Sequence, residues 1–174
     1  MKTFTILGAG WLGLELAKVL KSTYKIKVTS RNEEKLKMYE EEGFSSYILN
    51  ENNLNSLDEL LEANYLFINF PPSKFDDYLG FLDKIYCHKK IKNIEKIIFI
   101  SSTSIYPDIE GFFNEDFEIN SSSSKIVYDA EKLIENRSDI IFRVSALVGA
   151  NRISGRRFSA KLVEYPQTKI NFVH

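Results

Sequence analysis

The feature that most restricts how this chain can fold is a glycine-spaced turn close to its start. A short apolar run from Phe4 to Leu7 precedes the turn, and a periodic apolar segment follows it as far as Leu20. The turn itself consists of Gly8, Ala9, Gly10, Trp11, Leu12 and Gly13. The pattern lies between a strand-like and a helix-like segment, and another strand-like run begins at Lys25. It is therefore typical of a β-α-β unit that binds a dinucleotide.

Glycine is needed at each of the three positions of the turn for a different physical reason. Gly8 permits the tight change from strand to helix, Gly10 lets the backbone approach a pyrophosphate, and Gly13 lets the helix pack closely on the sheet. The phosphates would meet free main-chain amides at the positive end of the helix. We therefore predict that the whole turn binds a dinucleotide. The alternative is another doubly wound domain, such as a flavodoxin-like one, in which the glycines serve only the turn.

The residues after the second strand indicate which dinucleotide binds. An NAD site usually places Asp or Glu there to hold the ribose hydroxyls, whereas this chain has Ser30, Arg31 and Asn32. A guanidinium can hold a 2′-phosphate in a planar fork, and the two neighbouring side chains can add hydrogen bonds to it. We predict NADP as the cofactor, with NAD as the second choice. The alternative is an ordinary exposed arginine paired with Glu33 or Glu34.

Composition limits the classes of protein that need to be considered. A chain of 174 residues with 44% hydrophobic and 27% charged residues suits one core, so we expect residues 1–174 to form a single domain. With a net charge of -1, the chain has no positive electrostatic field that would attract nucleic acid or an acidic membrane. One cysteine and two histidines without ligand spacing argue against a disulfide framework and a metal site. No targeting or membrane-spanning segment is visible, so a cytoplasmic location is expected.

Strand-like and helix-like segments alternate along the chain. We predict strands near 3–8, 25–30, 45–49, 65–70, 95–101, 139–144 and 168–173, and helices near 11–22, 32–42, 55–62, 75–92, 123–136 and 157–164. Several strands are short apolar runs, as expected where helices cover both faces of a sheet. The predicted fold class is α/β, a Rossmann fold. Its doubly wound parallel sheet would have about seven strands in the order 3-2-1-4-5-6-7.

The end of the predicted fourth strand contributes to the same crevice, because the strand order switches there. Asn69, Phe70 and Pro71 follow that strand directly, and Pro71 and Pro72 restrict the backbone to an extended conformation. We predict that the first three residues bind the cofactor. The prolines can equally well stop the strand while Ser73 caps the next helix, and the two interpretations are compatible.

Hydroxyl-bearing residues gather after the fifth predicted strand, where a nicotinamide would lie in this architecture. The segment from Ser101 to Tyr106 reads SSTSIY. Together with the glycine turn, it resembles the extended short-chain dehydrogenase/reductase family, the NAD(P)-dependent epimerase/dehydratase group, and in particular its atypical bacterial members. The segments from Phe142 to Arg152 and from Ile170 to His174 are similar to later blocks of that family. The resemblance therefore spans nearly the whole chain.

The resemblance implies roles for individual residues. Ser101 would lie against the cofactor, and Ser102 would hydrogen-bond the substrate oxygen. The family also uses a Tyr to exchange the proton and a Lys four residues later to hold the ribose. Tyr128 and Lys132 have this spacing. Residues i and i+4 share one helix face, and a nearby ammonium favours the phenolate, so both are candidate catalytic residues.

The same helix can also be aligned with the family pattern in a second way. Family helices carry Ala-Glu about one turn after the Lys, and if Ala130 and Glu131 take those positions, Ser123 and Val127 replace the Tyr and the Lys. Neither residue could then perform the proton chemistry. In that case Tyr128 belongs to the surface of the helix.

Two functions follow from these patterns. The first is an NAD(P)-binding oxidoreductase-like protein that transfers hydride on an unidentified small or nucleotide-linked substrate, such as a nucleotide sugar. The second is a non-catalytic dinucleotide-binding or sensor module. A homodimer through the helices near 75–92 and 123–136 suits either function. Family members continue beyond the segment that ends at His174, so most of their C-terminal substrate-binding region is expected to be missing.

Overall fold

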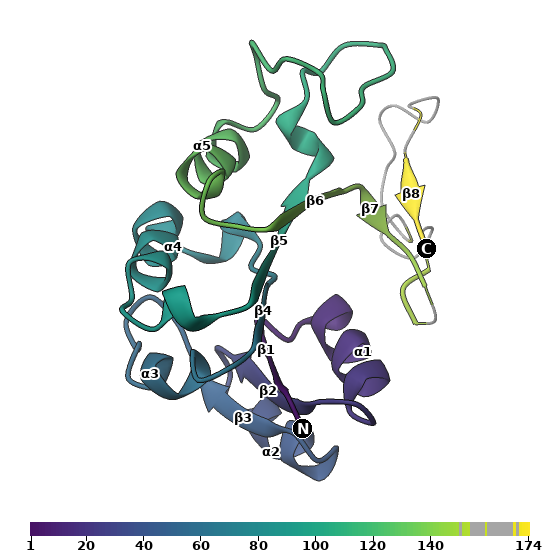
Figure 1. Ribbon diagram of the computed structural model, residues 1–174. Coiled ribbons are helices and arrows are strands. Elements are labelled where there is room, and N and C mark those ends of the chain that lie inside the picture. The colour runs from purple at the N-terminus through teal and green to yellow at the C-terminus, as the bar shows by residue number, and fades with distance from the viewer. Residues whose placement is uncertain (150, 154–158, 160–168, 170) are drawn as a thin grey trace.

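A computed structural model describes residues 1–149, 151–153, 159, 169 and 171–174 of the protein. Six parallel strands form its central sheet, in the order β3-β2-β1-β4-β5-β6 (Figure 1). The strands are β1 Thr3–Leu7, β2 Lys25–Ser30, β3 Ser45–Ile48, β4 Tyr65–Ile68, β5 Lys96–Ser102 and β6 Ile140–Val144. The predicted Rossmann fold and the order of its first six strands are confirmed.

Helices cover both faces of this sheet, as the sequence predicts for a doubly wound fold. The α-helices are α1 Trp11–Leu20, α2 Glu34–Glu41, α3 Leu57–Leu60, α4 Tyr78–Tyr86 and α5 Lys125–Ile134. Short 3₁₀ turns lie between them, η1 Pro72–Lys74, η2 Ile91–Asn93 and η3 Thr103–Ile105. Among the described residues, no helix combines the length and the apolar character needed to cross a membrane.

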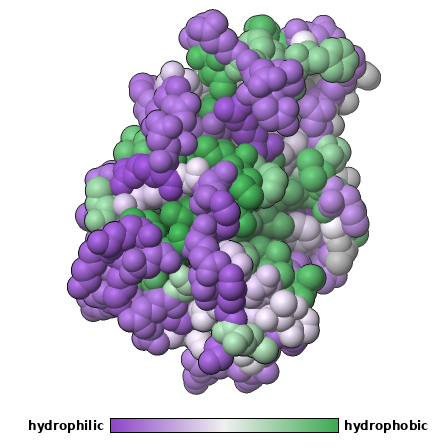
Figure 2. Space-filling model, viewed as in Figure 1, coloured by the Kyte–Doolittle hydropathy of each residue, from purple (hydrophilic) through white to green (hydrophobic). Residues whose placement is uncertain are grey.

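Side-chain alternation along β1 divides the core into two layers. Phe4 and Ile6 pack in a cluster with residues of α1 and α2, whereas Leu7 packs in a cluster with residues of α3, α4 and α5. The fully buried Thr5 faces the second layer, where its hydroxyl donates to the main-chain oxygen of Leu60 at 2.8 Å. Because successive side chains of a strand point to opposite faces, one strand anchors both layers. Figure 2 shows one face of the molecule, on which hydrophobic residues gather in the central part and hydrophilic ones lie around them.

The structure does not confirm a seventh strand in the main sheet for the residues that it describes. Phe172–Val173, β8, pairs instead with Ala146–Leu147, β7, in a separate two-stranded parallel sheet. The chain leaves the main sheet after β6, and the Ser145 hydroxyl donates to the main-chain oxygen of Asn171 at 2.7 Å. The late segment therefore joins this departing chain and not the edge of the main sheet. The helix predicted near 157–164 lies almost wholly outside the described residues.

The helix predicted near 75–92 is divided in the structure. The helical segment α4 begins only at Tyr78, because the side chain of Asp77 caps it by accepting a hydrogen bond from the amide of Gly80 at 2.9 Å. Ser73 lies inside η1 and does not cap α4. The segment from Pro71 to Phe75 consequently remains beside the carboxyl end of β4, where it forms part of the crevice described below.

Candidate functional site

The turn between β1 and α1 has a backbone that only glycine adopts easily at its first position. Gly8 has a φ of +87°, and a Cβ placed there would lie 2.5 Å from the main-chain oxygen of Asn69. The amide of Gly8 donates to the hydroxyl of Thr29 at 2.8 Å, and the side-chain amide of Asn69 donates to the Gly8 oxygen at 3.2 Å. These contacts join the ends of β1, β2 and β4 at one point.

The other two glycines differ sharply in their surroundings. A Cβ on Gly13 would lie 2.9 Å from the Gly8 oxygen and 3.0 Å from Ile6, so the absence of a side chain lets α1 pack against β1. A Cβ on Gly10 would meet nothing within 4 Å. Gly10 is the N-cap of α1 and offers no side-chain cap to the first amides of that helix. Those amides, from Trp11 onward, lack intrahelical acceptors and can bind an anion.

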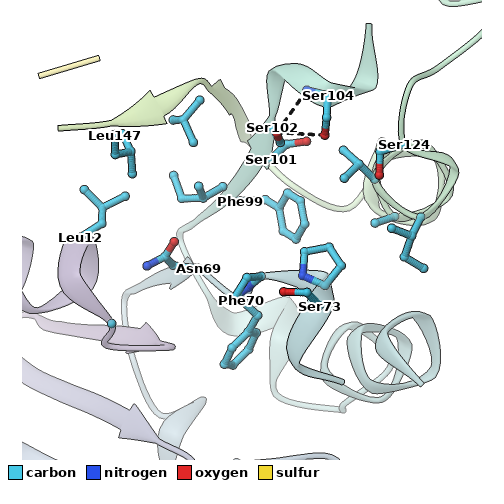
Figure 3. Close-up of a pocket in the computed structure, with 18 of the residues that line it drawn as sticks. Leu12, Asn69, Phe70, Ser73, Phe99, Ser101, Ser102, Ser104, Ser124 and Leu147 are labelled. Carbon is cyan, nitrogen blue, oxygen red and sulfur yellow. Dashed lines mark hydrogen bonds between the residues drawn. The ribbon is translucent and has the colours of Figure 1, made fainter. Parts of the chain in front are cut away.

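A cavity of about 590 Å³ opens beside this helix end, at the carboxyl ends of β4 and β5 (Figure 3). Helix α5 forms its far wall. The predicted site residues that line it are Gly10, Trp11, Leu12, Asn69, Phe70, Pro71, Ser101 and Ser102. The structure therefore brings together the glycine turn, the end of β4 and the hydroxyl segment, as the strand order requires.

The two central hydroxyls of this cavity have different hydrogen bonds. Ser101 donates its hydroxyl to the carboxylate of Glu131 on α5. Ser102 instead accepts from the amide of Ser104 at 3.1 Å and from its hydroxyl at 3.0 Å, as the dashed lines in Figure 3 show. Because a hydroxyl carries one proton, Ser102 can still donate that proton to a ligand oxygen.

A second cavity, of about 340 Å³, continues from the first along the other side of the glycine turn. Gly10, Asn69, Phe70 and Pro71 line both cavities. The predicted site residues found only in the second are Gly8, Ala9, Ser30, Arg31 and Asn32. Gly13 lies beneath the turn and lines neither. Because they share four lining residues, the two cavities adjoin and form one extended groove along the turn.

Local hydrogen bonds shape the turn after β2. The hydroxyl of Ser30 accepts from the amide of Asn32 at 3.0 Å, and the side-chain oxygen of Asn32 accepts from the amide of Glu34 at 2.8 Å. Arg31 does not use Glu33 or Glu34 as its partner. It donates to the main-chain oxygen of Lys74, across the groove.

Tyr128 and Lys132 lie in a different cavity from Ser102. They line a space of about 860 Å³ on the other side of α5, beneath the segment from Tyr106 to Asn120. Lys132 pairs there with Glu135 at 3.2 Å. Toward the first cavity α5 presents Ser124, Ile126, Val127 and Ala130. The structure thus keeps the candidate pair apart from the glycine turn, and its catalytic role stays a prediction.

A partly buried ion pair between Glu131 and Arg143 lines this third cavity, and Glu131 also contacts Ser101 of the first cavity. Glu131 is 6% exposed, and its carboxylate accepts from Nη2 of Arg143 at 2.9 Å and from Nε at 3.2 Å. Nη1 of Arg143 donates to the hydroxyl of Tyr106 at 3.1 Å. Burial opposes ionisation of the guanidinium, yet the hydrogen bonds to Glu131 and Tyr106 outweigh it and raise the pKa of Arg143.

The sequence contains a signal for this pair that the predictions missed. Glu131 stands on the apolar stripe of α5 with Val127, Ala130 and Ile134, all of them buried. A buried carboxylate requires an opposite charge, and Arg143 is the cation of the neighbouring strand β6.

Among the described residues, no group of three or more His, Cys, Asp and Glu side chains could hold a metal ion.

The parallel sheet, the left-handed glycine at the end of β1 and the groove at the switch in strand order are those of a Rossmann fold. No family model matches the chain. The chain is 29% identical to the protein YeeZ of Escherichia coli K12 over 189 residues, which cover 100% of this chain and 69% of YeeZ.

Two solved structures illustrate the fold. A putative NAD-dependent epimerase/dehydratase from Methylobacillus flagellatus has a TM-score of 0.67 and 22% identity over 87% of this chain and 56% of that one. A UDP-glucuronic acid 4-epimerase from Bacillus cereus, solved in complex with NAD, has a TM-score of 0.62 and 20% identity over 84% and 57%. The chain thus spans less than two thirds of the length of either protein. Its predicted resemblance to the epimerase/dehydratase group is confirmed at the level of the fold.

Proposed function

We propose that this chain binds NAD(P) along the groove beside the glycine turn and acts as an oxidoreductase-like protein on a small or nucleotide-linked substrate. The observation that carries the proposal is Gly10. Gly10 lines both cavities, a Cβ there would meet nothing within 4 Å, and it provides no side-chain cap to the first amides of α1. The NAD held by the 4-epimerase of the same fold supports it.

Different residues of the groove would bind different parts of the cofactor. The amides at the start of α1 would hold the pyrophosphate, and Asn69 and Pro71 would form the floor between the two halves of the cofactor. A bound nicotinamide supplies the hydride chemistry, and the protein supplies orientation. Ser102 would donate its free proton to the substrate oxygen and so position it.

The adenosine half of the groove favours NADP over NAD. NAD-binding sites use a carboxylate after the second strand to hold the ribose hydroxyls. Among the described residues that line the second cavity, none is Asp or Glu, and Arg31 occupies that position. A guanidinium is suited to a phosphate and offers no acceptor to a ribose hydroxyl.

The proposal predicts that Gly10→Ala separates binding from folding. A Cβ at this position meets no protein atom, and its φ of -71° suits alanine, so the unfolding midpoint is expected to stay unchanged. The same Cβ would hold a pyrophosphate away from the amides, so the Kd for NADPH is expected to rise about tenfold or more. Titration of nicotinamide fluorescence measures the Kd, and a urea melt provides the control. An unchanged Kd would contradict the proposed pyrophosphate position.

One observation favours the second candidate function, a non-catalytic dinucleotide-binding or sensor module. The face of α5 that lines the first cavity carries Val127 and Ala130 and no group that exchanges protons near neutral pH. Such a groove could hold a cofactor without using it.

Turnover of NADPH with a panel of aldehydes, ketones and nucleotide sugars distinguishes the two functions. For the oxidoreductase we expect Ser102→Ala to lower kcat about 100-fold with little change in the Kd for NADPH, because it removes a donor to the reacting oxygen. Tyr128→Phe is expected to leave kcat unchanged, because Tyr128 lies in the other cavity. Loss of turnover in Tyr128→Phe would instead support the Tyr-Lys pair. Tight binding without any turnover would favour the sensor module.

A further inference from the structure

The cavity at the adenosine end has two walls that come from distant parts of the chain. One wall is the turn after β2 with Arg31 and, on α2, Lys35; the other is the segment after β4 with Lys74 and Phe75. We propose that Lys74 and Phe75 are specificity-determining residues, which together with Arg31 and Lys35 select a ribose that carries a 2′-phosphate. This inference rests on the proposed dinucleotide binding and deepens it.

The second wall holds the guanidinium of Arg31 in place. Nη1 donates to the main-chain oxygen of Lys74, and Cζ lies 5.3 Å from the centroid of the Phe75 ring. A planar guanidinium that rests on an aromatic face loses little further freedom when it binds a ligand. The remaining N–H groups of Arg31 are then available to a phosphate.

Phe75 is itself fixed by aromatic packing. Its ring stacks on Phe81 of α4 with 4.7 Å between centroids, and its edge meets Phe70 at 5.4 Å. Phe70 and Phe81 are buried in the core layer beneath α4. The platform under Arg31 is therefore part of the rigid core and does not depend on the exposed loop alone.

The charges around this cavity have one sign. Arg31, Lys35 and Lys74 line it, and the described lining contains no carboxylate. Glu51, which borders a neighbouring hollow with Arg31, accepts from the amides of Asp76 at 3.1 Å and Asp77 at 3.3 Å.

Glu34 is the first residue of α2, directly after the turn that carries Arg31. It accepts from the side-chain amide of Asn32 at 3.4 Å and does not line the cavity. Three cations in a cavity lining without a carboxylate favour a dianionic phosphate over the neutral 2′-hydroxyl of NAD. The two lysine side chains thus add to the selection that Arg31 begins.

Lys74→Ala tests the proposal directly, because it removes the ammonium and keeps the main-chain oxygen that holds Arg31. We expect the Kd for NADPH to rise about tenfold and the Kd for NADH to change less than about twofold. Lys74→Arg restores the charge and should recover most of the NADPH affinity. The matched control is Lys37→Ala, an exposed lysine of α2 that lines none of the cavities described above. Competition by 2′,5′-ADP should also exceed that of 5′-ADP in the unmodified protein.

Phe75→Leu tests the platform separately. It keeps an apolar side chain in the core but removes the ring face, so the preference for NADPH over NADH should fall while Lys74 is intact. A thermal melt of the variant accompanies the titration, and only the ratio of the two Kd values is compared, because a general loss of stability would affect both cofactors alike.

The outcomes separate this inference from the function on which it rests. Equal weakening of NADPH and NADH in Lys74→Ala, or no change in either, would overturn the role of Lys74. An unmodified protein that binds NADH more tightly than NADPH would overturn the selection of a 2′-phosphate and leave dinucleotide binding intact. Failure of both cofactors to bind would remove the proposed function itself.

Discussion

Replacing Gly8 with alanine is expected to lower the free energy of unfolding by about 3–5 kcal/mol, as the sum of backbone strain and overpacking. The backbone at Gly8 has a φ of +87°, which an L-residue adopts at a cost. The new Cβ would also lie 2.5 Å from the main-chain oxygen of Asn69 and 2.8 Å from the ring of Phe70. Because Gly8 joins the ends of β1, β2 and β4, neither neighbour can move without disturbing the sheet.

Gly43 provides a matched control for this prediction. Its φ is +89°, nearly the same as that of Gly8, but a Cβ there would meet nothing within 4 Å. Gly43→Ala should therefore cost only the backbone strain, about 1–2 kcal/mol. Urea unfolding followed by circular dichroism measures both variants. Equal losses in the two would mean that crowding against Asn69 and Phe70 adds nothing.

Replacing Arg143 with methionine is the second large change, with an expected loss of about 3 kcal/mol. The variant leaves the carboxylate of Glu131, whose side chain is 8% exposed, without its ion-pair partner, while 23% of the Arg143 side chain is exposed. It also removes the donor to the hydroxyl of Tyr106. The expected value lies at the lower end of the range for buried pairs because solvent reaches part of Arg143.

Two further variants show whether burial is the cause. Arg137→Met removes an ion pair with Asp83 in which the side chains are 29% and 49% exposed, so a loss of only about 0.5 kcal/mol is expected. The double variant Glu131→Met/Arg143→Met removes both buried charges and should be more stable than Arg143→Met alone. A double variant that is less stable than the single one would show that the carboxylate does not depend on Arg143.

Much of the fold could be predicted from local patterns. The apolar runs at Tyr65–Ile68 and from Ile97 to Ile100 indicate strands, because a strand in a covered sheet must bury side chains. The seventh strand could not be predicted in this way. A strand-like segment near the end of the chain predicts an extended backbone, but it does not indicate which sheet the strand will pair with. In the structure Phe172–Val173 pairs with β7.

The candidate site shows the same division. The family resemblance implies a Tyr and a Lys four residues apart, and Tyr128 and Lys132 match that spacing. The spacing places two residues on one face of a helix but does not indicate which way that face points. The rotation of α5 about its own axis is set by the burial of Val127, Ala130 and Ile134 against the core. This burial places Tyr128 and Lys132 in the cavity behind α5.

The sequence by itself determined the β-α-β turn at Gly8, Gly10 and Gly13, the parallel Rossmann sheet and the set of residues that follow its strands, because these depend on neighbours in the chain. Only the tertiary structure decided what meets across the groove. Arg31 and Lys74 are 43 residues apart, and they approach each other because β2 and β4 lie on either side of β1. The predicted strand order brings the ends of β2 and β4 to one crevice, but which side chains meet there depends on the conformations of the assembled loops, which local sequence does not determine.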